Sequence, residues 1–210
     1  MKTDQLLRLM AADPALRINF DRRIALAFLA GMGFAAAVLL VMFGLRPDLV
    51  AALQSPVLAK TALPFAAGIV ALGTARACAR PGASLRGPVL ALGVVISLVA
   101  GAYLIGVMVR GPGGIAAGLA NPMMGMCLTA VLLLSTPILV LLIWAMRAGA
   151  NLSPARNGAV AGLASGAAGA ALYSVACDQD DVLFVVPAYS AAVLIVIVAG
   201  AIAGQFSLRL

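Results

Sequence analysis

The stretch Pro122–Met146, PMMGMCLTAVLLLSTPILVLLIWAM, contains no charged side chain from one end to the other. A helix that crosses the hydrocarbon core of a bilayer needs about 20 mostly apolar residues, and this run exceeds that length. The rest of the chain has the same character, since 64% of its 210 residues are hydrophobic and only 10% are charged. A water-soluble fold needs more polar surface than this composition provides. We therefore predict an integral membrane protein.

Six runs of this kind follow one another along the chain. The abundance of Gly and Ala, without a long alternating polar pattern, favours helices over a β-barrel. The sequence thus predicts an all-α integral membrane protein with a six-helix transmembrane domain over residues 24–210, preceded by a polar tail over residues 1–23. Pro137 is expected to kink the fourth span, and Lys60 to reach from the second span to the interface. The expected spans cover approximately residues 24–45, 56–77, 88–109, 122–146, 157–176 and 182–206.

Basic residues lie near the ends of these runs and divide unequally between the two sides. One side holds eleven of the fourteen, namely Lys2, Arg8, Arg17, Arg22, Arg23, Arg76, Arg80, Arg86, Arg147, Arg156 and Arg209. The other side has Arg46, Lys60 and Arg110 only. Because cytoplasmic connectors carry an excess of Lys and Arg, we expect both termini to lie in the cytoplasm.

Small residues recur at every fourth position in three of the expected spans. Such faces allow helix backbones to approach closely in lipid, and ordinary packing within the bundle is the interpretation that we favour. The positions are Gly93, Ser97 and Gly101 in the third span, Gly162, Gly166 and Ala170 in the fifth, and Gly200 and Gly204 in the sixth.

The composition disfavours several classes of function. The basic residues form no patch, so we expect no direct binding of nucleic acid, and membrane lipid is the surrounding partner. The chain has no histidine and no glutamate, which removes the usual general bases, and we expect no enzymatic activity. Proton- or ion-coupled transport usually requires a charged residue deep within a span, and this chain has none there. A small transporter or exporter, with a path along the Gly-rich third and fifth helices, and a structural subunit of a larger membrane complex remain as alternatives.

One short outward-facing connector concentrates the reactive groups of the chain. Between the fifth and sixth spans, residues 173–184 read YSVACDQDDVLF. A second outer thiol, Cys127, lies about 9 Å along the fourth helix from its outer end. Cys78 lies on the cytoplasmic side, where thiols stay reduced, and we expect it to be a bystander. The connector itself combines one thiol with three of the seven acidic residues, namely Cys177, Asp178, Asp180 and Asp181.

Two chemical interpretations of the outer thiols stay open. Cys127 and Cys177 can form a disulfide if their Cα atoms come within about 7 Å, or they can join a carboxylate in a soft metal site. The nearby acids are expected to raise the pKa of a thiol and to attract cations, which favours metal over a fast peroxide sensor. No resident cofactor is expected, only a transient heavy-metal ion. Alternatively, the thiols are small buried hydrophobes and the aspartates solvate a tight turn.

The N-terminal tail, MKTDQLLRLMAADPALRINFDRR, is the one sizeable polar segment. Thr3 or Asp4 can cap a helix, and Pro14 restarts the chain after it. Such a helix either lies on the membrane surface or occupies a groove on a cytoplasmic protein, and periodicity does not choose between the two. The apolar residues at or beside helical spacing are Leu6, Leu7, Leu9 and Met10, followed after the proline by Leu16.

These features together resemble the NrsF family, whose members are membrane anti-sigma factors named as negative regulators of sigma F. The resemblance covers essentially the whole chain: an opening MKTDQLLRLMAAD, six spans, and a third outer connector with a cysteine and acids that runs into LFVVPAYSAAVLIVIVAGAIAG. The chain departs from the family around that cysteine, where the family often has histidine or proline and this sequence reads Ala176-Cys177-Asp178. The ion or oxidant that it would detect is therefore left open.

The resemblance implies that the protein holds an extracytoplasmic-function sigma factor inactive at the bacterial inner membrane. Release would follow heavy-metal or oxidative stress, sensed through the two outward cysteines that match Cys127 and Cys177. We expect Asp178, Asp180 and Asp181 to assist those thiols. Sigma binding would fall to the tail from Met1 to about Arg23, with contributions expected from Thr3, Asp4, Leu6, Leu7, Leu9, Met10 and Leu16.

Overall fold

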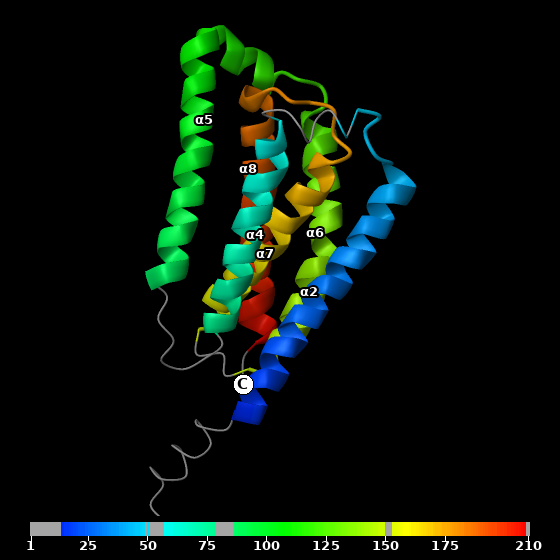
Figure 1. Ribbon diagram of the computed structural model, residues 1–210, viewed down its shortest axis with the longest axis vertical. Coiled ribbons are helices and arrows are strands. Elements are labelled where there is room, and N and C mark those ends of the chain that lie inside the picture. Colours follow the sequence, from blue (N-terminus) through cyan, green and yellow to red (C-terminus); the bar gives the residue numbers. More distant parts are fainter. Residues whose placement is uncertain (1–13, 49, 51–56, 79–85, 150–152, 209–210) are drawn as a thin grey trace, which may run out of the picture.

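The computed structural model describes residues 14–208 except 49, 51–56, 79–85 and 150–152. Within this part of the chain the regular structure is entirely helical, as the sequence predicts. Figure 1 shows a bundle in which consecutive helices run in opposite directions. The helices are α2 (Pro14–Met42), α4 (Leu58–Cys78), α5 (Arg86–Leu119), α6 (Met124–Met146), α7 (Pro154–Ser174) and α8 (Val182–Ser207).

Five of these helices are long and apolar enough to cross a membrane: Phe20–Met42 within α2, and α4, α5, α6 and α8 over their full lengths. The exception is α7, which forms where the fifth span is expected but is less apolar than the other five. Its sequence, PARNGAVAGLASGAAGAALYS, consists largely of Gly and Ala, which carry little apolar surface. The described chain thus has helices at all six expected places, and five of them have the apolar length of a span.

The least apolar helix, α7, lies in the middle of the bundle. It packs against α8, α4, α6 and α2, and most of its residues are buried. Its glycines bring its backbone close to that of α8. A Cβ atom at Gly162 would lie 2.8 Å from Ile197 Cα, and one at Gly158 would lie 2.8 Å from Gly204 Cα. The small-residue faces of the fifth and sixth expected spans therefore pack the bundle, as predicted.

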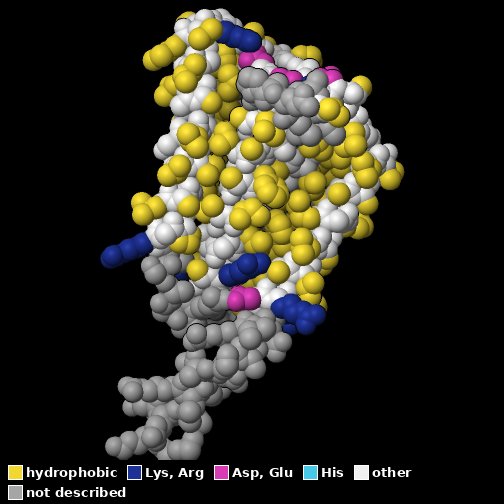
Figure 2. All heavy atoms as spheres, viewed as in Figure 1, with side chains coloured by type: hydrophobic (Ala, Val, Ile, Leu, Met, Phe, Trp, Pro, Cys, Tyr) yellow, Lys and Arg dark blue, Asp and Glu magenta, His cyan; other side chains and the backbone are white. Residues whose placement is uncertain are grey.

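The third expected span behaves differently. Helix α5 stands at the edge of the bundle, with α8 and α4 as its main neighbours (Figure 1). Large apolar side chains such as Leu104 and Met108 are exposed along it, and Figure 2 shows yellow apolar side chains at intervals along its length. A Cβ atom at Gly93 or Gly101 would meet nothing within 4 Å. The prediction that these small residues pack against a neighbouring helix is therefore wrong for this helix within the described chain.

Helix α5 is also longer than the sequence predicts, because it continues beyond a kink to Leu119. The kink lies at Gly111, whose φ of 66° falls in the left-handed region that glycine adopts easily. Pro112 suits the start of a new helical turn, where its missing N–H costs nothing. The segment 112–119, which we call the hook, lies over the start of α8. A Cβ atom at Gly118 would lie 2.9 Å from the carbonyl carbon of Leu183.

The two ends of the bundle have different contents. The chain leaves α2, α5 and α7 at the upper end in Figure 1, whereas α2 begins and α8 ends at the lower end. We call the upper end the thiol end, because it holds Cys127 and Cys177, and the lower end the terminal end. The three basic residues of the sparsely charged side, Arg46, Lys60 and Arg110, all lie at the thiol end.

Candidate functional site

Cys127 and Cys177 belong to different parts of the chain, the start of α6 and the end of α7, and meet at the thiol end. Cys177 lies just after α7, and its amide donates to the carbonyl of Tyr173 at 3.0 Å, which continues the last turn of that helix. Cys127 lies in the first turn of α6, where its amide donates to the carbonyl of Met123 at 2.9 Å. Helix geometry at these two ends therefore directs both thiols into the space between α6 and α7.

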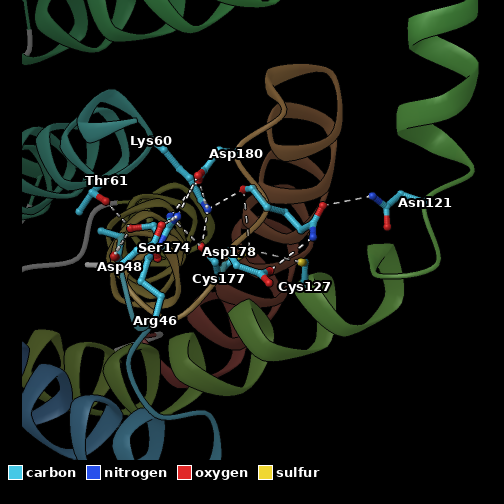
Figure 3. Close-up of polar contacts among 12 residues, drawn as sticks. Arg46, Asp48, Lys60, Thr61, Asn121, Cys127, Ser174, Cys177, Asp178 and Asp180 are labelled. Atoms are coloured by element: carbon cyan, nitrogen blue, oxygen red, sulfur yellow. Dashed lines mark hydrogen bonds and ion pairs between the residues drawn. The ribbon is translucent and has the colours of Figure 1, made fainter. Parts of the chain in front are cut away.

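The sulfur atoms of Cys127 and Cys177 lie 3.9 Å apart, although the residues are 50 positions apart in the sequence. Both cysteines are free thiols, and their side chains are buried, with 1% and 4% of each residue exposed. A disulfide bond is about 2.05 Å long, so the sulfur atoms need to approach by only about 1.9 Å to form one. The structure thus supplies the proximity that sequence reasoning left open (Figure 3).

Aromatic side chains enclose the thiols within the bundle. Tyr173 of α7 packs edge-on against Phe43, with ring centroids 5.5 Å apart, and its ring lies 6.3 Å from that of Tyr189 on α8. Tyr173 and Tyr189 belong to the buried core, and Phe43, just beyond α2, packs against it. The thiol pair is therefore held in an apolar setting with limited access to water, which restricts the reagents that can reach it.

The connector that carries Cys177 is held by Arg46, which follows α2. One side of the Arg46 guanidinium bonds to the carboxylate of Asp48 at 2.7 and 2.8 Å. The other side bonds to both carboxylate oxygens of Asp180 at 2.9 Å and to the carbonyl of Cys177 at 3.3 Å. Only 5% of the Arg46 side chain is exposed. A guanidinium has five N–H donors, and all five are used here.

Lys60, on α4, is the second cation that holds this connector. The sequence suggested that this residue reaches to the interface from within the second span, but it lies in the first turn of α4, already at the thiol end. Its ammonium donates to the carbonyls of Cys177 and Gln179 at 2.7 and 2.6 Å and to Asp180 at 3.2 Å. Figure 3 shows Arg46, Asp48, Lys60 and Asp180 together, and we call these four residues the ionic cluster.

The acidic residues of the connector are mostly neutralised by the chain itself. Asp180 belongs to the ionic cluster, and Asp181 pairs with Arg110 at 2.6 Å while its other oxygen caps α8 through the amide of Leu183. Asp178 bonds only weakly, to the Gln179 amide at 3.4 Å. No group of three or more Cys, Asp, Glu or His side chains in the described ranges is arranged to hold a metal ion. The connector therefore does not present three open carboxylates beside the thiols.

The electrostatics of Cys177 also differ from the expectation. The sequence predicted that neighbouring acids would raise the pKa of the thiol, but the pKa of Cys177 is lowered to about 6. The main cause is a hydrogen bond with the Cys127 thiol, and the positive charge of Lys60 acts in the same direction against the opposing effect of burial. Arg46 likewise holds the pKa of the Asp180 carboxyl below its usual range, chiefly through hydrogen bonds. The expectation fails because Asp180 and Asp181 are paired with cations and because Lys60 and the Cys127 thiol favour the thiolate form of Cys177.

Sequence reasoning missed the ionic cluster entirely. Its members lie up to 134 positions apart, so no local pattern joins them. One signal was nevertheless present, because Arg46, Lys60 and Arg110 were the three exceptions in an otherwise one-sided distribution of basic charge. Each of the three pairs with an aspartate of the connector. Charges that depart from the topology rule therefore marked the site.

The predicted sigma-binding residues are placed less fully. Leu16 lies in the first turns of α2, which begins at Pro14 and continues without interruption through the expected boundary at residue 23. The remaining members of the predicted set lie outside the described residues: Thr3, Asp4, Leu6, Leu7, Leu9 and Met10.

Fold and site together define a helical protein of membrane type, with a buried pair of thiols at one end and the start of α2 at the other. The chain belongs to the NrsF family, negative regulators of sigma F, whose family model matches residues 10–210. It is 33% identical to the anti-sigma-F factor NrsF of Caulobacter vibrioides (strain NA1000 / CB15N) over 216 residues, covering 100% of both chains. No solved structure matches the chain. The family consists of regulators that act on a sigma factor, which confirms the expectation of a non-enzymatic protein.

Proposed function

We propose that the protein is an inner-membrane anti-sigma factor that binds an extracytoplasmic-function sigma factor in the cytoplasm and releases it when its outer thiols react. The observation that carries this proposal is the 3.9 Å separation of two free thiols at the end of the bundle opposite the start of α2. Membership of a family of sigma-factor regulators supplies the partner class. The proposal therefore places signal and partner at opposite ends of one helical bundle.

The membrane topology in this proposal has six spans and both termini in the cytoplasm. Helix α7 crosses the bilayer inside the bundle, where its neighbours shield its weakly apolar surface from lipid. The greater number of basic residues at the terminal end supports a cytoplasmic position for that end. The thiol end then faces the periplasm, where disulfides form and persist.

The reaction that fits the site best is oxidation of the two thiols. Cys127 and Cys177 lose two protons and two electrons and form one S–S bond, and a small disulfide can accept the electrons and leave as two thiols. Capture of a soft heavy-metal ion by the same two sulfurs is the other reaction of the pair. Its ligand set would be limited to these thiols, since the described chain offers no group of three suitable side chains.

The double variant Cys127→Ser, Cys177→Ser tests the sensing half of the proposal. Both substitutions are nearly isosteric and leave the ionic cluster intact, so the protein should still bind its sigma factor. We expect transcription from a sigma-dependent promoter to stay low under diamide or cadmium, whereas the parent chain responds to at least one of them. Cys78→Ser serves as the matched control, because Cys78 lies at the far end of α4. A normal response in the double variant would contradict thiol sensing.

Deletion of residues 2–13 tests the binding half. This segment precedes α2, so its removal leaves every described helix intact. We expect the sigma factor to stop co-purifying with the membrane protein and the promoter to become active without stress. Undiminished co-purification would move the sigma-binding surface away from the tail.

A further inference from the structure

The proposed function assigns no role to Arg46, although this residue contacts both α2 and the connector that carries Cys177. It stands shortly after the end of α2, and its backbone amide donates to the carbonyl of Val175, 3.2 Å away, just beyond α7. Its guanidinium donates to the carbonyl of Cys177 and to both carboxylate oxygens of Asp180. A single residue thereby joins α2 to the connector that carries the reactive thiol.

The link between Arg46 and α2 is short and constrained. The amides of Phe43 and Gly44 both donate to the carbonyl of Leu39, at 2.9 and 3.0 Å. Gly44 has a φ of 71°, so the helix ends in the left-handed conformation that glycine favours at this position. The ring of Phe43 also packs on Tyr173 at the end of α7. A displacement of Arg46 is therefore passed to α2 rather than absorbed by a long loop.

The Arg46 side chain has no free N–H donor that could form a new hydrogen bond if its partners moved. All five guanidinium N–H groups are engaged, and the side chain is almost fully buried. If Cys177 or Asp180 moves, Arg46 must either follow or leave buried donors and a buried charge unpaired, which is costly. Arg110 provides the contrast, since 56% of its side chain is exposed and water can replace its one carboxylate.

We infer that Arg46 is a positioning residue that ties the redox state of the Cys127–Cys177 pair to the position of α2, and so to the segment that precedes Pro14. This inference rests on the proposed function. On oxidation the two sulfur atoms, now 3.9 Å apart, must come within bonding distance, about 2.05 Å. If the Cys177 backbone moves as the sulfur atoms approach, its carbonyl moves with it, and Arg46 is displaced because it donates a hydrogen bond to that carbonyl.

Thermodynamic linkage gives the test a readout that a merely structural role would not change. If the reduced protein binds the sigma factor more tightly than the oxidised protein, sigma binding must stabilise the reduced thiols by the same factor. The reduction potential of the pair then becomes less negative when the sigma factor is bound. A tenfold difference in affinity corresponds to a shift of about 30 mV for this two-electron couple.

The experiment uses the full chain in lipid nanodiscs, with and without the sigma factor that co-purifies with it. Glutathione buffers of graded ratio set the potential, and alkylation of the remaining thiols reports the fraction reduced. We expect a shift on sigma binding in the parent chain and none in Arg46→Gln, although both bind the sigma factor when reduced. Arg110→Gln is the matched control, because it removes a guanidinium from the thiol end without touching α2, and it should keep the parent shift.

Each outcome has a defined meaning. The full parent shift in Arg46→Gln would overturn the role of Arg46 while leaving thiol sensing intact. Absence of a shift in the parent chain would instead refute the proposed function, and this inference with it. If Arg46→Gln does not insert or fold, Arg46→Lys decides, because it keeps the charge but offers three donors in place of five. A shift clearly smaller than that of the parent supports the inference, and a full shift overturns it.

Discussion

Helices α7 and α5 are both rich in small residues, yet they occupy opposite environments in one bundle. The weakly apolar α7 lies in the centre with its glycines against α8, whereas the strongly apolar α5 stands at the edge with Gly93 and Gly101 against nothing. In lipid, an apolar side chain gains little from moving inside a protein, so close backbone packing decides which helix is central. Burial in such a bundle therefore follows the fit between helices rather than hydrophobicity.

The same contrast continues at the thiol end. The connector after α7 is held by Arg46 and Lys60, whose side chains are only 5% and 7% exposed. The upper end of α5 is tied to α8 by the ion pair of Arg110 and Asp181, in which the arginine is largely exposed. Buried ion pairs are costly to break, whereas exposed ones contribute little, so the α7 side should be the rigid side of the site.

Removal of one cation from each side tests whether the α7 side is the more strongly held. Arg46→Met removes the partner that Asp48 and Asp180 share, and we expect the loss of these charge-assisted hydrogen bonds to lower the free energy of unfolding by about 1.5–3 kcal/mol. Arg110→Met should lower it by no more than about 1 kcal/mol, since its ion pair is solvated. Thermal unfolding of the two variants in the same detergent measures the difference. Equal losses would show that the ionic cluster is no more rigid than the surface pair.

The two sides should also differ in their effect on the ionisation of the Cys177 thiol. Because its pKa is lowered, Cys177 holds more thiolate at pH 7 than an unperturbed thiol, whose pKa is about 8.5. Burial of Cys177 limits the absolute rate of alkylation, but because the folded pKa is lowered, that rate should fall only as the pH drops through about 6 rather than through about 8.5. The rate of iodoacetamide labelling of Cys177 against pH, in a Cys78→Ser background, measures this profile.

Two substitutions locate the source of that low pKa. Lys60→Met removes the nearest cation and should move the alkylation profile toward higher pH, whereas Arg110→Met should leave it in place. A Lys60→Met profile that coincides with that of the parent chain would show that hydrogen bonds to Cys177, chiefly from Cys127, lower the pKa without a contribution from Lys60.

The smallest effect is expected from matched glycine substitutions on the two helices. A Cβ atom at Gly162 of α7 would lie 2.8 Å from Ile197 Cα, so Gly162→Ala should destabilise the protein by about 1–3 kcal/mol through overpacking. Gly101→Ala of α5 meets open space and should be neutral or slightly stabilising, because alanine favours the helix. Unfolding temperatures compare the two variants. A loss at Gly101 as large as that at Gly162 would mean that α5 is packed against a partner.

Local patterns predicted the helices well, because the length and apolar character of a segment are properties of consecutive residues. Helices formed at all six expected places, and α4, α6 and α8 ended within two residues of their expected bounds. The hook was missed because Gly111 and Pro112 indicate a break, and nothing local shows that a new helix follows and covers α8. The direction of the Cys177 pKa was also wrong, because Lys60 lies close in space and because two of the three following acids, Asp180 and Asp181, are paired with cations.

The sequence by itself determined that the chain is helical, apolar enough for a membrane, and equipped with two thiols and an acidic connector. Tertiary structure decided which of these groups meet: Cys127 and Cys177 across 50 positions, and Arg46 and Asp180 across 134. The physical reason is that hydrophobic length accumulates along the chain, whereas a disulfide or an ion pair depends on distances of a few ångströms between helices. The glycines of α7 permit such closeness within the bundle, because they bring its backbone against α8 and α6.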